Sequence, residues 1–294
     1  MKIAILTDTH SGILQEEAKE NGFFLLAAPF MVDGVQHYEG IDLSAHDFYE
    51  KLESDADVST SQPSPGEVTQ TWDRILQTYD QIVCITLSSG LTGGFQTMRM
   101  LAEDEPYAGR VFPVNNTSVS VTERAAVYQA KALIEKGYDG AQIRDILEKH
   151  RKDALIFITV TTLKFLKKGG RITPAAAALG SLLRIKPVLE IDGEKLDAFA
   201  KVRTMAQAKE TMLHAIQTTL DTRLHDPDAS HCYIMVAHTK NEEAAEEFLD
   251  EAKQKWPKAT FYMAPLALAI ACHTGPGALA IVAERKLPEL DDRF

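Results

Sequence analysis

The sequence has few cysteines, and their spacing matches neither a disulfide framework nor a metal site. The chain of 294 residues contains three, whereas disulfide scaffolds and zinc sites need cysteines in pairs at regular spacing. Cys84, Cys232 and Cys272 each lie among apolar residues. We therefore expect them to be buried and reduced, as is typical of a cytoplasmic protein.

Positive charge is also scarce, and long apolar runs are absent. Lysine and arginine total 31 against 42 aspartates and glutamates, which gives a formal net charge of -11. This balance argues against nucleic acid or an anionic membrane as the main partner. No apolar run approaches the roughly 20 residues of a membrane span, and the apolar segment at residues 1–6 is too short for a signal peptide. We expect a cytoplasmic protein without stable membrane insertion.

The usual nucleotide and hydrolase motifs are missing from the most glycine-rich loop, residues 88–94. Its sequence, Ser-Ser-Gly-Leu-Thr-Gly-Gly, is neither G-x-x-x-x-G-K-[ST] nor G-x-G-x-x-G, and it lacks G-x-S-x-G. Asp8 and His10 follow the first predicted strand as possible metal ligands. Two candidates are too few for a site, so we expect neither a metal nor a cofactor.

What the chain does contain is an apolar strand that leads into this loop and then into a helix. Residues 82–87 are apolar and β-prone, as in a strand buried on both faces of a parallel sheet. Residues 95–103 favour a helix. Free N–H groups at a helix start attract anions, and glycines and hydroxyls allow close approach and add donors. The same loop could equally form only a tight turn.

Strands and helices alternate over residues 1–153, which predicts a three-layer α/β/α domain with a mostly parallel sheet. Asp33-Gly34 indicates a hairpin, and Ser64 with Glu67 has the spacing of a capping box at a helix start. The pattern over residues 154–294 predicts a second, mixed-sheet α/β domain. Predicted strands cover residues 3–6, 24–32, 82–87, 110–114, 155–160, 184–191, 195–202, 231–237, 260–264 and 278–283. The longer predicted helices cover residues 65–78, 95–103, 119–136, 141–149, 174–183, 205–222 and 241–256.

Two further places carry polar groups that could meet an anion. Thr60 and Ser61 precede the capped helix, either as ordinary loop hydroxyls or as donors to the same anion as the loop 88–94. His273 is followed by Gly275-Pro276-Gly277 and is expected on a loop. There it would be either solvent-exposed or an N–H donor to a carboxylate or phosphate.

Taken in order, several motifs resemble those of the DegV family of bacterial fatty-acid-binding proteins. The resemblance covers nearly the whole chain, and its specificity lies in the order of seven motifs. The matching segments are Tyr38-x-Gly40-x-Asp42-Leu43-Ser44, Thr60-Ser61-Gln62-Pro63-Ser64, Ser88-Ser89-Gly90-Leu91-Thr92-Gly93-Gly94-Phe95-Gln96, Lys168-Gly169-Gly170-Arg171-Ile172, Ile185-Lys186-Pro187, Lys201-Val202-Arg203 and His273-Thr274-Gly275-Pro276-Gly277.

The resemblance implies that one long-chain fatty acid is bound between the two domains. It also implies a carrier rather than an enzyme: a separate fatty acid kinase subunit would hold ATP and phosphorylate the acyl carboxylate for phospholipid synthesis. Carried over by motif, the Thr60 and Thr92 hydroxyls would bind the carboxylate, and Arg171 would lie near the head group. Arg203 would lie on the face that meets the kinase. Further residues implied near the carboxylate are Ser61, Ser89, Gly93 and His273.

The chain departs from the family pattern at several positions, and other functions remain open. Thr9 and Thr92 each stand in place of a serine, Gly94 in place of a threonine and Asn116-Thr117 in place of Asp-Ser. Thr92 keeps a hydroxyl, so carboxylate binding should survive, whereas the lost aspartate and the glycine-for-threonine change bear on acyl-chain preference and kinase coupling. One alternative is a small-molecule enzyme of the related dihydroxyacetone-kinase fold that uses His273. Another is a regulatory module with a vestigial cleft. A co-purified fatty acid would favour the carrier, and turnover without a partner would favour the enzyme.

Overall fold

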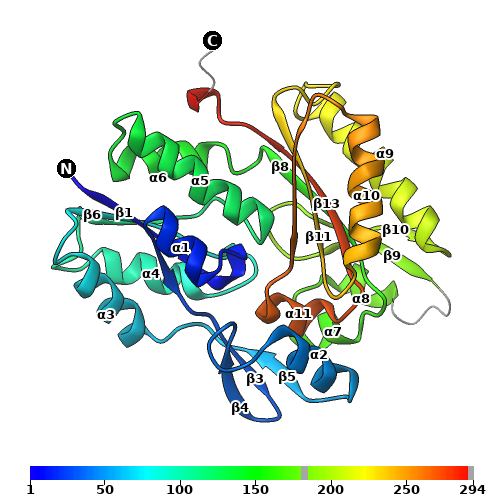
Figure 1. The fold of residues 1–294 in the computed structure, drawn as a ribbon, viewed down its shortest axis with the longest axis horizontal. Helices are drawn as coiled ribbons and strands as arrows, with labels where there is room; N and C mark the ends of the chain where they lie inside the picture. Colours follow the sequence, from blue (N-terminus) through cyan, green and yellow to red (C-terminus); the bar gives the residue numbers. More distant parts are fainter. Residues whose placement is uncertain (180–184, 291–294) are drawn as a thin grey trace. The chain divides into compact units, whose positions relative to one another are not determined.

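A four-stranded parallel sheet with the order β2-β1-β6-β7 forms the centre of the first unit of the chain (Figure 1). The computed structural model describes residues 1–179 and 185–290. Unit 1 contains residues 1–151 and 287–290, and unit 2 contains residues 152–286 apart from the gap. The strands of the central sheet are β1 (Ile3–Asp8), β2 (Phe23–Leu26), β6 (Gln81–Ile85) and β7 (Val111–Val114).

Helices cover both faces of this sheet, because its strands are apolar on both sides. Successive residues of a strand point to opposite faces, so Ile5 of β1 joins one core while Leu6 joins the other. The first core receives side chains from α1 (Gln15–Asn21), α5 (Val121–Glu135) and α6 (Gly140–Lys149). The second receives them from α3 (Pro65–Ile75) and α4 (Gly94–Ala102). The predicted three-layer α/β/α fold is confirmed.

A second, antiparallel sheet in unit 1 has the order β4-β3-β5. The predicted hairpin joins β3 (Pro29–Val32) to β4 (Val35–Tyr38) through Asp33 and Gly34, both with positive φ, as a two-residue hairpin turn requires. The sequence predicted neither β5 (Val58–Thr60) nor the break that separates β2 from β3. The helix α2 (Ala45–Glu53) begins at the N-cap Ser44.

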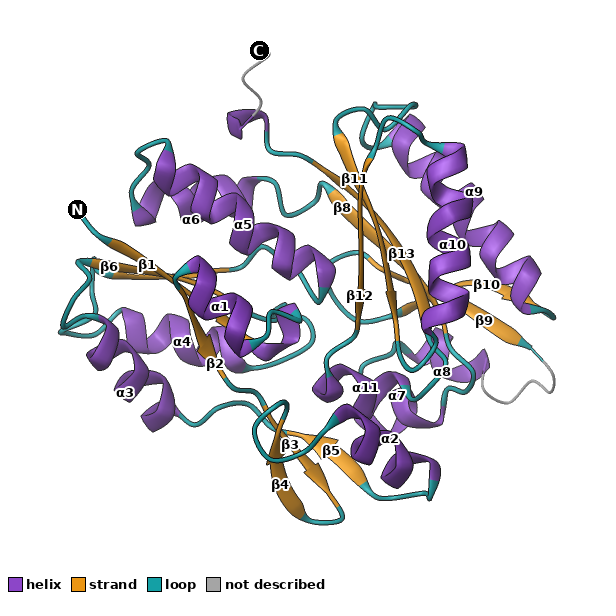
Figure 2. Cartoon of the chain, in the orientation of Figure 1, coloured by secondary structure: helices purple, strands orange, loops and turns teal. Residues whose placement is uncertain are grey.

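Unit 2 is built on a mixed sheet, as predicted, and its strand order is β10-β9-β8-β13-β11-β12 (Figure 2). Its described strands pair antiparallel except for β11 with β12. Helices α9 (Met205–Thr222) and α10 (Glu242–Lys255) pack on one face and bury a large apolar core. The strands are β8 (Ala154–Thr159), β9 (Lys186–Ile191), β10 (Asp197–Val202), β11 (Cys232–His238), β12 (Thr260–Pro265) and β13 (Leu279–Arg285). Three short helices complete the unit: α7 (Lys164–Gly169), α8 (Pro174–Leu179) and α11 (Leu268–Thr274).

The last described segment of the chain packs with the first unit, whereas the sequence assigned residues 154–294 to the second domain. Leu287 is buried in the core under α5 and α6, and Leu290 packs against the same core. The predicted end of the alanine-rich helix at residue 183 and the strand start at residue 184 lie outside the described residues. Within the described part of the chain, no helix combines the length and apolar character that a membrane crossing requires.

Candidate functional site

The loop after β6 lies where open α/β sheets bind their ligands. The strand β1 pairs with β2 on one side and β6 on the other, so the chain order reverses between β1 and β6. Ligands of such sheets bind beyond the carboxyl ends of the strands at this reversal. The Ser88 carbonyl accepts the N–H groups of Leu91 (3.0 Å) and Thr92 (3.1 Å), which folds the loop tightly before α4.

Thr92, near the end of this loop, accepts a hydrogen bond through its hydroxyl oxygen. Its Oγ1 accepts the N–H of Gly94 at 3.2 Å. A hydroxyl is one donor as well as an acceptor, so accepting this bond leaves its O–H free to donate. Thr92 and the neighbouring Ser89 are half-buried, and Gly93 is exposed.

The structure brings the segment 60–62 against this loop. A Cβ atom built on Gly93 would lie 2.9 Å from Oε1 of Gln62, whose Nε2 donates to Thr97 Oγ1 of α4 at 3.1 Å. Thr60 ends the antiparallel strand β5, opposite Phe30, and the Ser61 N–H donates to the Pro29 carbonyl at 3.3 Å. The two predicted hydroxyl segments of unit 1 are therefore neighbours, and Gln62 is the contact between them that the sequence did not single out.

Beside the loop lies a buried polar cluster that includes Asp8 and His10. These two side chains bind each other, with 2.7 Å between His10 Nδ1 and Asp8 Oδ1, and the Leu87 N–H donates to Asp8 Oδ2 at 3.1 Å. Burial pushes the pKa of Asp8 up, but His10 and the hydrogen bonds from His10 and Leu87 outweigh it and hold that pKa below its usual value. Asp8 thus anchors the start of the loop. Glu123 completes the cluster, and the sequence analysis missed it.

In unit 2, His273 does not lie on a loop as predicted but in the last turn of α11. The run Leu-Ala-Ile-Ala-Cys before it is apolar and forms a short buried helix, which the following Gly275 ends with a φ of 70°. The imidazole packs directly on Gly169 at the end of α7, where a built Cβ would lie 2.7 Å from Cε1 and closer still to Nδ1. Two predicted motifs of unit 2 therefore meet at Gly169.

Arg171 contacts the same glycine. Its guanidinium donates to the Gly169 carbonyl, and burial lowers its pKa. The arginine remains charged at neutral pH, because a guanidinium ordinarily loses its proton only in strongly alkaline solution. An imidazole and a guanidinium are thus held around one glycine, and both are donors to an anion.

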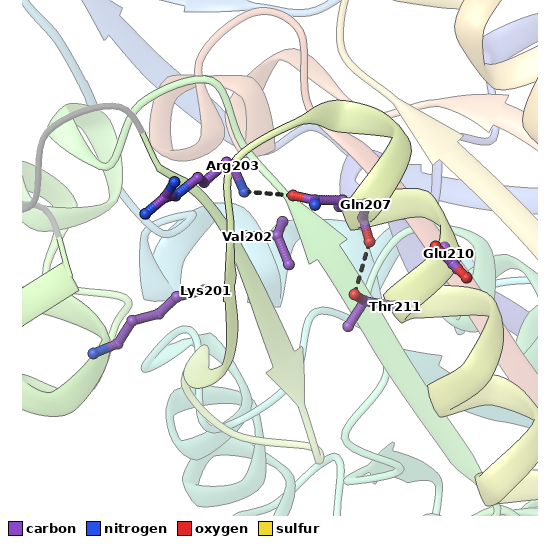
Figure 3. A pocket seen from close by; sticks show the side chains of 6 residues that line it. All are labelled: Lys201, Val202, Arg203, Gln207, Glu210 and Thr211. Atoms are coloured by element: carbon purple, nitrogen blue, oxygen red, sulfur yellow. Dashed lines mark hydrogen bonds between the residues drawn. The ribbon is translucent and has the colours of Figure 1, made fainter.

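Arg203, the residue predicted to meet a partner, is exposed beside an open groove of about 520 Å³ (Figure 3). Its backbone N–H donates to Gln207 Oε1 at 3.0 Å, which fixes the start of α9. In Figure 3 the side chains of Arg203 and Lys201 both extend away from α9. The groove is lined by Lys201, Val202, Arg203, Gln207, Glu210 and Thr211.

One group of side chains in the described residues has the spacing of metal ligands. His46, Asp47 and Glu50 of α2 have ligand atoms within 4.8 Å of one another, but all three are exposed. Asp47 accepts the Ser44 hydroxyl at 2.7 Å as part of the helix cap. This group therefore has an explanation as a helix start, and we assign no ion to it.

The fold is an α/β/α unit with a hydroxyl-rich loop at its switch point, followed by a mixed-sheet unit. It places the chain in a class of two-unit α/β proteins. The model of one family within this class, described as "Uncharacterised protein, DegV family", matches residues 2–286. The chain belongs to the DegV family.

Known relatives and solved structures agree with this assignment. Protein DegV of Bacillus subtilis is 29% identical over 286 residues, covering 96% of this chain and 98% of its own. A DegV domain-containing protein of Listeria monocytogenes is 31% identical over 283 residues, covering 95% of this chain and 97% of its own. A solved structure described as fatty acid binding of a DegV family protein from Thermus thermophilus has a TM-score of 0.87 at 28% identity, and that of DegV, a fatty acid binding protein from B. subtilis, has 0.85 at 27%. The matches cover 97% of this chain and 100% of each of those chains.

Proposed function

We propose that this protein binds one long-chain fatty acid and presents its carboxylate to a separate fatty acid kinase in the cytoplasm. The observation that carries the proposal is the contact between the segment 60–62 and the loop 88–94. It occurs in a family whose solved members from T. thermophilus and B. subtilis are described as fatty acid binding. The kinase would transfer phosphate from ATP to the acyl carboxylate and so supply phospholipid synthesis.

In this proposal the Thr60 and Thr92 hydroxyls donate to the carboxylate, with Ser61, Ser89 and Gly93 beside them. A carboxylate that leaves water needs several donors to offset its lost hydration. The His273 imidazole adds one donor from unit 2, and Arg171 lies near the head group. Hydroxyls and a neutral imidazole donate and accept hydrogen bonds without carrying a fixed charge. Such donors suit a ligand that must later be released or modified.

The acyl tail supplies most of the affinity. About 14 methylenes at about 0.8 kcal/mol each contribute roughly 11 kcal/mol of apolar transfer free energy. Association and ordering cost several kcal/mol of this. The remainder is enough for tight binding without chemistry in this chain, so we assign the phosphoryl transfer to the partner.

Identification of the lipid that co-purifies from a bacterial host tests the proposal directly. Mass spectrometry of the native protein should show one fatty acid per chain. Protein stripped of lipid should rebind one equivalent of fatty acid. The bound fatty acid should be phosphorylated only when a fatty acid kinase and ATP are added. A protein that rebinds no fatty acid, or that turns over a carbonyl or phosphorylated substrate alone, contradicts it.

A further inference from the structure

Two carboxyl groups share a buried site beside the loop that the proposed function uses. Asp8, at the end of β1, is 6% exposed, and Glu123, in the first turn of α5, is fully buried. The Glu123 side chain lies against the Asp8 carboxyl. Two ionised carboxylates that lie against each other in a buried site repel, so one of them should hold a proton.

The hydrogen bonds identify Glu123 as the protonated partner. Asp8 receives donors on both oxygens, from His10 and from the Leu87 N–H. Glu123 Oε1 accepts the Thr7 hydroxyl at 3.2 Å, and the Asp8 backbone N–H is a second donor to this carboxyl, but its buried Oε2 has no partner of ordinary geometry among the described residues. An ionised oxygen in that position is costly, whereas a protonated one can donate to Asp8. Burial raises the pKa of Glu123 well above its usual value, and the negative charge of Asp8 is the second largest cause of this rise.

Hydrogen bonds from adjacent residues of the backbone connect Asp8 to the loop that carries Thr92. Asp8 holds the Leu87 N–H, the next N–H, that of Ser88, donates to the Ser118 carbonyl at 2.9 Å, and the Ser88 carbonyl accepts the Thr92 N–H. Ser118 lies just before α5, the helix that carries Glu123. Asp8 therefore holds Leu87, and the segment just before the helix of Glu123 holds Ser88.

Apart from Asp8, the charged side chains on the elements around Glu123 are paired with groups other than Glu123. On α5, the adjacent Arg124 binds Glu17 of α1 at 2.7 Å. His10, from the short turn after β1, is bound to Asp8. The 3-10 turn at residues 288–290, which packs near α5, contributes Glu289, whose carboxylate faces Lys149 and His150 of unit 1. The strand β6, which also packs against α5, contains no acidic or basic residue. Asp8 is thus the charge that acts on Glu123.

We propose that Glu123 carries a proton at neutral pH and, through Asp8, is a positioning residue for the loop 88–94. Loss of this proton at alkaline pH places a second negative charge beside Asp8 and loosens the loop. If the loop binds the lipid carboxylate as proposed above, affinity for the fatty acid falls with it. The inference concerns the loop itself, so it can be tested with and without lipid.

Infrared spectroscopy of lipid-free protein with isotope-labelled glutamate tests the proton without a variant. A carboxylic acid band should be present at neutral pH, vanish as the pH rises, and be missing from Glu123→Gln. Absence of the band from the wild type overturns the proposal.

The amide NMR signals of Leu87 and Thr92 report the conformation of the loop in the same lipid-free protein. In the wild type these signals should shift with pH in step with the band, and in Glu123→Gln they should stay constant. Glu135→Gln, an exposed position on the same helix, should titrate like the wild type. The positioning role is overturned if the amide shifts of the wild type do not follow the pH dependence of the infrared band. It is also overturned if the same shifts titrate in Glu123→Gln as they do in the wild type.

Lipid binding separates this inference from the proposed function. From neutral to alkaline pH the dissociation constant of the wild type should rise about threefold more than that of Glu123→Gln, the loss of one modest hydrogen bond. The ligand's own titration is common to both proteins and cancels. If neither protein binds fatty acid, the proposed function fails, while the band and the amide signals still decide the inference. Equal pH profiles in two proteins that do bind lipid overturn it.

Discussion

The His273 imidazole occupies the space that a side chain at Gly169 would need. A Cβ atom on that glycine would lie 2.7 Å from Cε1 of the ring, closer than the 3.0 Å below which real Cβ contacts essentially never fall. Gly169 belongs to the last turn of α7 and His273 to the last turn of α11, so this contact lies where the two short helices pack against each other. Arg171 binds the carbonyl of the same glycine. The position of the histidine therefore depends on a residue that has no side chain.

Replacing Gly169 with alanine should displace His273 and weaken fatty acid binding. The overlap requires the ring or a helix to move, which costs about 1–3 kcal/mol of unfolding free energy, as overpacking does. Loss of one donor to a carboxylate weakens binding about tenfold or more. Calorimetric titration and thermal unfolding measure the two effects.

A double mutant separates the steric effect from other effects of the substitution. Gly169→Ala in a His273→Ala background should cost much less stability, because the ring that it meets is gone. Gly66→Ala, where a Cβ meets nothing within 4 Å, should leave both properties unchanged or slightly raise stability. Equal destabilisation by Gly169→Ala in both backgrounds would refute the contact.

Thr239→Val should destabilise the segment after His273. Thr239 is fully buried, and its hydroxyl donates to the Gly275 carbonyl at 2.6 Å and accepts the Ala278 N–H at 2.9 Å. Valine has the same shape but leaves both backbone groups without this partner, at about 1–3 kcal/mol for each buried group left unsatisfied. Chemical denaturation should show the loss. The exposed Thr218→Val, which removes a single bond to its own helix, should stay close to wild type, and a similar loss there would argue against the buried hydroxyl's role.

Arg203→Ala should spare lipid binding and reduce phosphorylation by the kinase. The side chain is exposed beside its groove, so removing it leaves the protein's own packing intact (Figure 3). A charged group at the rim of an interface acts mainly on association, so the KM of the kinase for the loaded protein should rise and kcat should change less. Arg99→Ala, an exposed arginine of unit 1 paired with Glu103, is the matched control. Loss of lipid binding in Arg203→Ala would show that the residue belongs to the ligand site.

Local signals in the sequence predicted the elements that depend on neighbouring residues. The capping box of Ser64 and Glu67 is present at the start of α3, and Asp33-Gly34 makes the hairpin turn. By contrast, β5 has three residues and exists because it pairs with β3, which lies far from it in the sequence. The helix α1 buries a single residue, Ala18, so it has no apolar periodicity to detect.

The candidate site was predictable as a set of motifs but not as a set of contacts. The resemblance identified Thr60, Thr92 and His273, yet the contact of Gln62 with Gly93 depends on tertiary packing between distant segments. The same holds for Gly169 beneath the histidine. Glu123 did leave a signal: the residue one turn later on the same helix is Val127 rather than a basic partner.

The central claim is that the Thr60 and Thr92 hydroxyls hold the acyl carboxylate. It is tested most directly by calorimetric titration of lipid-stripped protein with a long-chain fatty acid, comparing wild type, Thr60→Ala with Thr92→Ala, and the exposed control Thr218→Ala, whose hydroxyl donates to the His214 carbonyl of its own helix. The account predicts an affinity at least roughly tenfold lower in the double variant, the loss of one or two net hydrogen bonds to a charged group. The control should bind as the wild type does, and all three proteins should unfold at similar temperatures. A double variant that folds and binds the fatty acid as tightly as the wild type would contradict the account.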